Sequence, residues 1–329
     1  MVLWLLFVCA ILVTFVTTFG RKWYDRNCRK TTGRCHCTTQ LHGKTVFITG
    51  ATAGLGRETA YALAARGARV ILACRNLNKA RKVAEDIVRK TANPNVFIRL
   101  LDVADFDSIR RFAKDFLADG SHLHILINNA GIGSQKLWRS PQGLELTMAT
   151  NHFGPFLLTN LLLDTMKKSA PSRVINVSSI GHTCCKQLPW DDLGGFQATH
   201  SGWATYSRSK LCNILFTKQL AERLKDTGVT ANSLHPGVVS TEIFGKVDNW
   251  LFKSFIAPLV SWFGKTSVEG IQTIIHLALS EELATVSGKY FSDCKESKCS
   301  RLARNPEAAK KLWDLSERIV GLSEETSLA

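Results

Sequence analysis

The chain has 329 residues, of which 45% are hydrophobic and 21% are charged, and its formal net charge at pH 7 is +15. This length allows one large domain or two small ones, and the composition is typical of a globular protein. It excludes a mainly disordered chain, a collagen-like repeat and a coiled-coil rod.

The first 20 residues contain no charged side chain, and a basic cluster from Arg21 to Arg34 follows them against one acid, Asp25. As a helix, such a run can cross a hydrocarbon core of ~30 Å. A cleaved signal peptide usually carries its basic residues before the apolar stretch, whereas here they come after it. We therefore predict an uncleaved transmembrane anchor over 1–20 and a basic juxtamembrane linker over 21–40, with the body of the protein cytosolic.

Ten cysteines are spread along the chain, and Cys74 and Cys212 fall inside predicted regular elements. Reduced thiols in a cytosolic body explain them more simply than a disulfide framework. Cys35-His36-Cys37 has the residue types of half a zinc site, but no second ligand pair follows at zinc-like spacing. We therefore predict no metal site and interpret these three residues as part of the juxtamembrane linker.

From Lys44 onward, short apolar strands alternate with amphipathic helices. Strands are predicted over 45–49, 68–74, 95–101, 124–128, 173–179, 229–236 and 288–292. Helices are predicted over 54–66, 76–91, 105–119, 143–168, 204–227, 267–280 and 306–320. Continuous apolar strands separated by helices indicate a parallel sheet covered on both faces. We predict a single doubly wound, Rossmann-type α/β domain over 41–322, with a mainly parallel seven-stranded sheet and a short tail over 323–329.

A glycine-rich turn joins the first strand to the first helix, with the sequence Thr49-Gly50-Ala51-Thr52-Ala53-Gly54-Leu55-Gly56. Glycines let the backbone turn tightly and approach a pyrophosphate, and the helix start offers unpaired N–H groups. The predicted dinucleotide contacts in this turn are Gly50, Thr52, Gly54, Leu55 and Gly56.

The residues after the second strand indicate which dinucleotide is used. A carboxylate here would bind the ribose hydroxyls of NAD, but the segment is Ala73-Cys74-Arg75-Asn76. The planar guanidinium of Arg75 can pair with a 2′-phosphate. We therefore predict NADP(H), held here by Arg75 and Asn76, with a solvated arginine at a helix start as the alternative.

Two more strand ends are candidate cofactor contacts. Asp102-Val103 follows the third strand and is placed to border the adenine. Asn128-Asn129-Ala130-Gly131 follows the fourth strand, and its small residues would let the backbone lie close to the cofactor. We predict contacts from Asp102, Val103, Asn129, Ala130 and Gly131, although a simple tight turn also explains either segment alone.

Tyr206 and Lys210 lie four residues apart in a predicted helix, so their side chains share one face. An isolated phenol has a pKa of ~10, and a neighbouring ammonium lowers this value because it favours the phenolate. The pair therefore predicts a proton donor and acceptor that works near neutral pH.

Taken together, the chain from Lys44 to about residue 294 resembles the short-chain dehydrogenase/reductase family. The matching residues stand in the family's order: Thr49-Gly50-xxx-Gly54-x-Gly56, Asn128-Asn129-Ala130-Gly131, Asn151, Ser179, Tyr206, Lys210 and Pro236-Gly237.

The resemblance implies catalytic roles for four of these residues. Tyr206 would exchange a proton with the substrate oxygen, and Ser179 would hydrogen-bond that oxygen. Lys210 would bind the nicotinamide ribose and tune Tyr206, while Asn151 would hold a water in a relay to Lys210. Ser178 is the alternative to Ser179, because neighbouring strand residues point to opposite faces.

The resemblance also places Pro236-Gly237-Val238-Val239-Ser240-Thr241 at the nicotinamide end, and we expect the contacts there to come from Pro236, Gly237, Val239 and Thr241. His152 and His235 are expected to be packed and hydrogen-bonded instead of catalytic, because Tyr206 already supplies the acid and base.

Within this family, the chain is similar to the microsomal, NADP-preferring retinol dehydrogenases. The similarity rests on the predicted anchor and on the segments 73–76, 151–159, 211–216 and 287–294. Ser179 lies 27 residues before Tyr206, about twice the spacing in many members of the family. Residues 244–263 are rich in apolar side chains and are open to three interpretations: core, a substrate lid or a membrane contact.

The leading hypothesis is a membrane-anchored oxidoreductase that uses NADP(H) and acts on retinol and retinaldehyde. The alternatives are the same chemistry on steroid or lipid-derived aldehydes and ketones, or a non-catalytic NADP(H)-binding scaffold. We expect the endoplasmic reticulum membrane, with the mitochondrial membrane and the lipid droplet as alternatives. No nucleic-acid partner is expected, and the resemblance implies a homodimer through the helices near 143–168 and 204–227.

Overall fold

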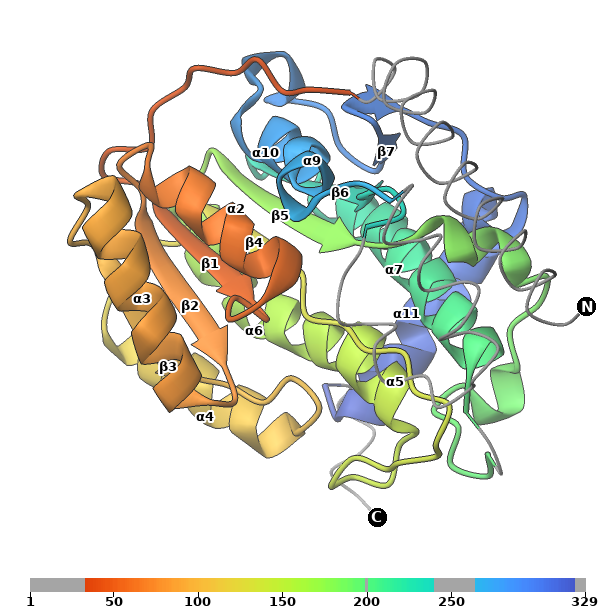
Figure 1. Ribbon diagram of the computed structural model, residues 1–329. Coiled ribbons are helices and arrows are strands. Elements are labelled where there is room, and N and C mark those ends of the chain that lie inside the picture. Colours follow the sequence, from red (N-terminus) through yellow and green to blue (C-terminus); the bar gives the residue numbers. More distant parts are fainter. Residues whose placement is uncertain (1–32, 199–200, 240–263, 323–329) are drawn as a thin grey trace, which may run out of the picture.

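The computed structural model describes residues 33–198, 201–239 and 264–322 (Figure 1). The predicted anchor over 1–20, most of the basic linker, the apolar segment 244–263, Thr241 and the tail lie outside these residues. Among the described residues, no helix is both long enough and apolar enough to span a bilayer.

The central element is an eight-stranded sheet with the strand order β3-β2-β1-β4-β5-β6-β7-β8. The strands are β1 (Thr45–Thr49), β2 (Arg69–Cys74), β3 (Val96–Leu100), β4 (Ile125–Asn128), β5 (Ser172–Val177), β6 (Val229–His235), β7 (Tyr290–Ser292) and β8 (Lys295–Glu296). All pairings are parallel except that of β7 with β8. The predicted doubly wound, mainly parallel α/β domain is confirmed.

The prediction of seven strands was wrong, because β8 adds an antiparallel edge strand of two residues. Between β7 and β8 stand only Asp293 and Cys294, which have φ values of 52° and 59°. Two successive residues with positive φ are typical of a tight hairpin turn that sends the chain straight back. A strand this short has no hydrophobic alternation that a sequence pattern can detect.

Helices cover both faces of the sheet (Figure 1). They are α2 (Gly54–Ala64), α3 (Leu77–Thr91), α4 (Phe106–Ala118), α5 (Leu146–Met148), η2 (Ala149–Phe153), α6 (Gly154–Lys168), η3 (Ile180–Cys184), η4 (Trp190–Asp192), α7 (Trp203–Arg223), α9 (Ser267–Gly270), α10 (Gln272–Leu279), η6 (Glu281–Leu283), η7 (Leu302–Arg304) and α11 (Pro306–Val320). Neighbouring residues of a strand point to opposite faces of the sheet, so the domain has one hydrophobic core on each face. Phe47 of β1 packs in the core formed with α4, α6, α7 and α11. Val46 and Ile48 pack in the core formed with α2 and α10.

The long helix predicted over 143–168 is interrupted. The chain forms one turn of α-helix in α5, widens into the π-helical η2, and resumes as α6. Pro155 lies in the first turn of α6 and has no N–H to donate to the carbonyl four residues earlier, which belongs to Asn151. The break therefore falls at the residue that the sequence predicts as part of the proton relay.

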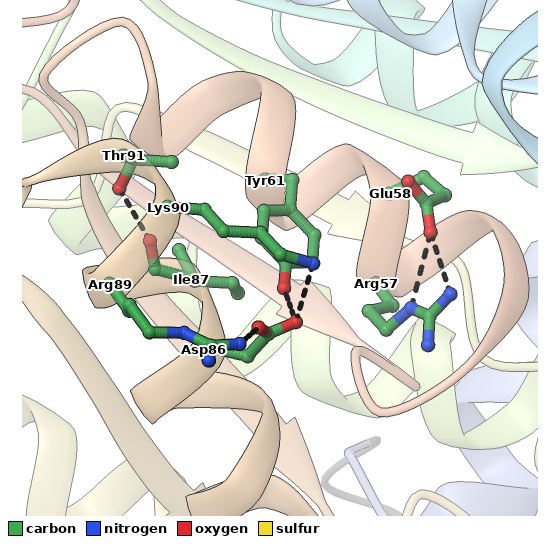
Figure 2. Close-up of polar contacts among 8 residues, drawn as sticks. All are labelled: Arg57, Glu58, Tyr61, Asp86, Ile87, Arg89, Lys90 and Thr91. Carbon is green, nitrogen blue, oxygen red and sulfur yellow. Dashed lines mark hydrogen bonds and ion pairs between the residues drawn. The ribbon is translucent and has the colours of Figure 1, made fainter.

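A polar cluster joins α2 to α3 on the outer surface (Figure 2). The Asp86 carboxylate accepts hydrogen bonds from the Tyr61 hydroxyl and from Arg89, and Lys90 Nζ lies 3.0 Å from it. The hydrogen bonds from Lys90 and Arg89 hold the pKa of Asp86 below its usual value. This cluster fixes α3 against α2, which begins at the glycine-rich turn.

The buried histidines predict how stability depends on pH. His152 is fully buried beside Phe153 and Phe216, with Nε2 2.9 Å from Ser316 Oγ, and burial lowers its pKa to about 3. Below the ordinary histidine pKa of 6.5, His152 binds a proton in the unfolded chain but stays neutral in the folded chain. The free energy of unfolding should therefore fall as the pH drops from about 6.5, by about 1.4 kcal/mol per pH unit for each such histidine.

Urea unfolding of the wild type and His152→Gln between pH 7.5 and 5 tests this expectation. The wild type should lose stability toward acid, and the variant should show a slope smaller by about one proton. Ser316→Ala offers a matched control, because it removes the hydrogen-bond partner of His152 but no titratable group and should keep the wild-type slope. Equal slopes in the wild type and His152→Gln would contradict the assignment of the acid lability to His152.

Candidate active site

A cavity of about 480 Å³ opens beyond the carboxyl ends of the parallel strands, where ligands bind in doubly wound folds. It is lined by residues that follow β1 to β6 and by the start of α7. The predicted site residues that line it are Gly50, Thr52, Gly54, Leu55, Arg75, Asn76, Asp102, Val103, Asn129, Ala130, Gly131, Ser179, Tyr206, Lys210, Pro236, Gly237 and Val239. Gly56 and Asn151 do not line it, and Thr241 lies outside the described residues.

The glycine-rich turn presents an uncapped helix start to this cavity. Gly50 and Gly54 have φ values of +66° and +49°, a conformation that L side chains rarely adopt. Ala53 is the N-cap of α2 and supplies no side-chain hydrogen bond, so the first N–H groups of the helix have no side-chain cap. Free N–H groups at the positive end of a helix can bind an anion such as a pyrophosphate.

Gly56 contributes through packing behind the turn. A Cβ at this position would collide with the Gly50 carbonyl oxygen and lie 2.6 Å from Asn129 Nδ2. Thr49 joins the same two loops, because its Oγ1 accepts hydrogen bonds from the N–H groups of Asn129 and Ala130, each at 3.0 Å. Asn129 Nδ2 donates in turn to the Thr49 carbonyl at 2.9 Å. Glycine at position 56 therefore allows α2, the turn and the loop after β4 to meet.

Two exposed cations stand together at the end of the cavity that follows β2. Arg75 and Lys79 both line it, and neither forms an ion pair within the part of the chain that the structure describes. The Asn76 side chain accepts a hydrogen bond from the Lys79 N–H at 2.9 Å and so caps α3. Sequence reasoning missed Lys79, although its place four residues after Arg75 at a helix start was a detectable signal.

The predicted catalytic side chains meet where β5 ends and α7 begins. Ser179 Oγ accepts a hydrogen bond from the Gly181 N–H at 3.1 Å and lies near Tyr206. Lys210 Nζ lies 5.5 Å from the centre of the Tyr206 ring and donates to the Val177 carbonyl at 3.0 Å.

Ser178 also borders the cavity, but its hydroxyl donates to the Lys210 carbonyl at 2.6 Å. The two neighbouring serines therefore have different contacts. Ser178 holds α7 against β5, and Ser179 is the serine beside the phenol.

The pKa of Tyr206 moves in the opposite direction from the sequence expectation. Burial raises it above 10, and a hydrogen bond with Ser179 offsets only part of this rise. Burial also lowers the pKa of Lys210 to about 8, because the ammonium has lost its water. With this pKa, Lys210 still carries its charge at pH 7. Burial nevertheless keeps Tyr206 a neutral phenol, the form that donates a proton.

Asn151 stands behind the cavity, with its side chain fully engaged. Its Oδ1 accepts from the Ile132 N–H at 2.8 Å, and its Nδ2 donates to the Ile132 carbonyl and to Ser209 Oγ, both at 2.9 Å. A Cβ on Gly131 would lie 3.3 Å from Lys210 Nζ and 3.4 Å from Asn151 Oδ1. The small residue at 131 therefore lets Lys210 and Asn151 approach the same point.

Sequence reasoning also missed the apolar rim of the cavity. The Trp203 ring stacks on Tyr206, with 5.4 Å between centroids and 25° between planes, yet 52% of this residue is exposed. Ile180 and Val238 line the same cavity and are 50% and 51% exposed. His235 lines it as well, although it was expected to be packed, and burial lowers its pKa to about 4. Large exposed apolar side chains that share one opening indicate a binding surface for an apolar group.

Comparisons with known proteins identify the kind of protein that carries this site. A family model described as short chain dehydrogenase matches residues 44–251. Retinol dehydrogenase 11 of Mus musculus is 47% identical over 292 residues, which are 88% of this chain and 90% of that protein. Retinol dehydrogenase 12 of Homo sapiens is 47% identical over 290 residues, with the same two shares. Retinol dehydrogenase 13 of Homo sapiens is 43% identical over 296 residues, which are 89% of each chain.

Solved structures show the same fold. An uncharacterised protein from Mycobacterium paratuberculosis aligns with a TM-score of 0.70 and 32% identity, covering 88% of this chain and 98% of its own. A protein described as an NAD(P)-dependent gluconate 5-dehydrogenase from Beutenbergia cavernae, whose structure holds NADP at low occupancy, aligns with a TM-score of 0.62 and 23% identity. That alignment covers 77% of this chain and 96% of the other.

The packing behind the glycine-rich turn can be tested with Gly56→Ala. The added methyl group must push the turn away from Asn129, so we expect at least tenfold weaker binding of a nicotinamide dinucleotide and about 1–3 kcal/mol lower stability. Isothermal titration calorimetry with NADPH and NADH, together with urea unfolding, measures the two effects. Gly120→Ala is the control: its φ of +62° strains the backbone, but nothing lies within 4 Å of its Cβ, and it should bind the dinucleotide as the wild type does. Wild-type dinucleotide binding by Gly56→Ala would show that this close approach is dispensable.

Proposed function

The chain belongs to the short-chain dehydrogenase family and is an oxidoreductase of that type, and we propose that it transfers a hydride between NADP(H) and a lipophilic alcohol or carbonyl compound, retinol and retinaldehyde above all. One observation carries this proposal. Tyr206, Ser179 and Lys210 line the same cavity as the glycine-rich turn and the apolar rim. This reaction needs a site for the cofactor phosphates, an acid that gives a proton to the substrate oxygen and a surface for the apolar substrate. The start of α2, Tyr206 and the apolar rim offer these three features.

The residues present fit a dinucleotide with a 2′-phosphate. The uncapped start of α2 suits the pyrophosphate, and Arg75 and Lys79 offer two cations where a 2′-phosphate would lie. No carboxylate stands at the end of β2 to repel that phosphate. At the other end, Pro236 and Gly237 follow β6 and border the catalytic residues. When bound, NADP(H) supplies or accepts the hydride.

The chain's own part in the reaction is to hold the substrate oxygen and to move one proton. In the reducing direction, the Tyr206 hydroxyl donates its proton to the carbonyl oxygen, and Ser179 Oγ hydrogen-bonds the same atom. Burial keeps Tyr206 protonated at neutral pH, so the acid is ready before the substrate arrives. In the oxidising direction, Tyr206 must first lose its proton, and the nearby Lys210 ammonium would stabilise the phenolate.

The proton is replaced through the region behind Lys210. Because the Asn151 side chain is bound to Ile132 and Ser209, its amide has no free donor. Its carbonyl lacks an α-helical partner, since Pro155 has no N–H. We assign the water-binding role to this carbonyl, which would place a water between Asn151 and Lys210.

The substrate assignment follows from the rim and from the relatives. Trp203, Ile180 and Val238 offer an apolar surface at the opening, which suits a long hydrocarbon chain next to a reactive carbonyl. The relatives that are 43–47% identical carry the name retinol dehydrogenase. A steroid or a lipid-derived aldehyde has the same apolar character, so kinetic comparison must separate these substrates.

We further propose that residues 1–20 anchor the protein in the endoplasmic reticulum membrane, with the catalytic domain on the cytosolic side. The support is the uncharged run followed by a basic cluster. Such an anchor would keep the cavity close to a bilayer that dissolves retinoids. We also propose a homodimer that pairs through α6 and α7.

The choice of cofactor is tested with Arg75→Asp and Lys79→Glu. Losing a charge-assisted contact with the 2′-phosphate and adding a carboxylate should lower the NADPH-to-NADH ratio of kcat/KM by about 10–100-fold. Arg81→Asp is the control, because Arg81 is exposed on the same helix but does not line the cavity. A wild type that prefers NADH would overturn the NADP(H) assignment.

The reaction itself is tested with the full-length chain in detergent or lipid vesicles. We expect NADPH oxidation with all-trans-retinaldehyde, and Tyr206→Phe should lower kcat by about 10²–10⁴-fold, while NADPH still binds. Tyr61→Phe is the matched control, because Tyr61 donates its hydrogen bond to Asp86 and neither residue lines the cavity. Faster turnover of a steroid ketone or a lipid aldehyde would replace the retinoid assignment. NADPH binding without turnover of any of these would favour the non-catalytic scaffold.

A further inference from the structure

A second cluster of chemically reactive side chains lies away from the cavity, on the segment that precedes β1. The thiol sulfurs of Cys35 and Cys37 and a ring nitrogen of His276 all lie within 4.8 Å of one another, and all three residues are partly buried. The sequence alone offered no second half for the Cys35-His36-Cys37 motif. The fold supplies a third ligand from α10, far along the chain. We propose that Cys35, Cys37 and His276 bind one Zn²⁺ ion.

The geometry needs little adjustment to bind zinc. With Zn–S bonds of about 2.3 Å and Zn–N bonds of about 2.0 Å, tetrahedral ligand atoms stand roughly 3.5–3.8 Å apart. Side chains within 4.8 Å can reach this spacing by small rotations. Cys35 and Cys37 are two residues apart in a segment without helical structure, and burial alternates along it, so both thiols face the body while His36 is exposed. Thiolate and imidazole are the ligands that zinc prefers in proteins.

Backbone hydrogen bonds hold the ligand groups in place. The Cys35 N–H donates to Gln272 Oε1 at 3.0 Å, and Gln272 lies four residues before His276 on the same face of α10. The Cys37 N–H donates to the Cys35 sulfur at 3.4 Å, which holds the two residues in one local arrangement. Thr39 Oγ1 then donates to the Leu279 carbonyl at the end of α10. The segment is therefore docked along the whole helix, and the ligands do not depend on a free loop.

Charge balance explains why the cluster suits a cation. Two thiolates this close would repel each other, and a bound cation removes that repulsion. Zn²⁺ would displace both protons and leave a neutral site. Among the described residues no fourth ligand belongs to the cluster, so the fourth position is open to water. Cys294 is a partly buried free thiol that interacts electrostatically with Cys37, and we test it as a fourth ligand.

Such an ion would fasten the segment before β1 to α10. The proposal is independent of the oxidoreductase activity, because neither cysteine nor His276 lines the catalytic cavity. The bound ion would hold the segment before β1 against α10, in addition to the hydrogen bonds that already join them.

The experiment uses the full-length chain in detergent, without a histidine tag, incubated with Zn²⁺ and a reductant and then desalted. Metal analysis should give about one zinc per chain. Cys37→Ser and His276→Gln should each reduce zinc affinity at least 100-fold, whereas Cys184→Ser, which removes an exposed thiol elsewhere, should keep it. Replacement by Co²⁺ should give a sulfur-to-cobalt charge-transfer band that Cys37→Ser weakens. NADPH binding by each variant shows that it has folded.

Three results would overturn the proposal. The first is a folded, reduced wild type that retains no zinc. The second is zinc that stays in both Cys37→Ser and His276→Gln, which would place the metal elsewhere. The third is metal-free protein whose proteolytic peptide containing Cys35 and Cys37 is two hydrogens lighter, which would identify a Cys35–Cys37 disulfide. Loss of zinc in Cys294→Ser would keep the proposal and would fill the fourth position with that thiolate.

Discussion

Parallel pairing of neighbouring strands is the constraint on which the site depends. Because β1 to β6 all run in the same direction, their carboxyl ends meet at one edge of the sheet. The glycine-rich turn, the loop after β4 and the serine pair after β5 are thereby brought together from distant parts of the chain. Thr49 strengthens this arrangement, since its hydroxyl accepts two N–H groups of the neighbouring loop. The space left above these ends is the cavity.

Desolvation then determines the chemistry at that edge. Tyr206 and Lys210 are both buried, and burial pushes the pKa of the phenol up and that of the ammonium down. Each shift favours the neutral form, so the free protein holds its proton on Tyr206. The interruption at η2 contributes a second polar element, because a helix that contains Pro155 cannot satisfy every carbonyl before it. In the proposed reaction, the Asn151 carbonyl at this irregular helix and the pair Tyr206 and Lys210 would belong to one proton path.

The opposite side of the sheet carries a different kind of constraint. Helix α10 packs its apolar residues on the core and offers Gln272 and His276 to the segment before β1. Helix α7, which carries Tyr206 and Lys210, packs in the other core, so these two residues and the proposed zinc site lie on opposite faces of the sheet. A substitution of Cys35, Cys37 or His276 would change how the segment before β1 is held against α10, and it would leave the residues of the cavity in place.

The sequence by itself determined the features that depend on near neighbours. Short, continuous apolar runs located seven of the eight strands, the glycines marked the turn after β1, and the four-residue spacing put Tyr206 and Lys210 on one helix face. These depend only on local periodicity and backbone freedom. The tertiary structure decided the rest: which of Ser178 and Ser179 stands beside the phenol, the direction of the pKa shift of Tyr206, and the meeting of Cys35 and Cys37 with His276. Burial and contact between distant segments arise only when the chain is folded, so no local pattern could have given them.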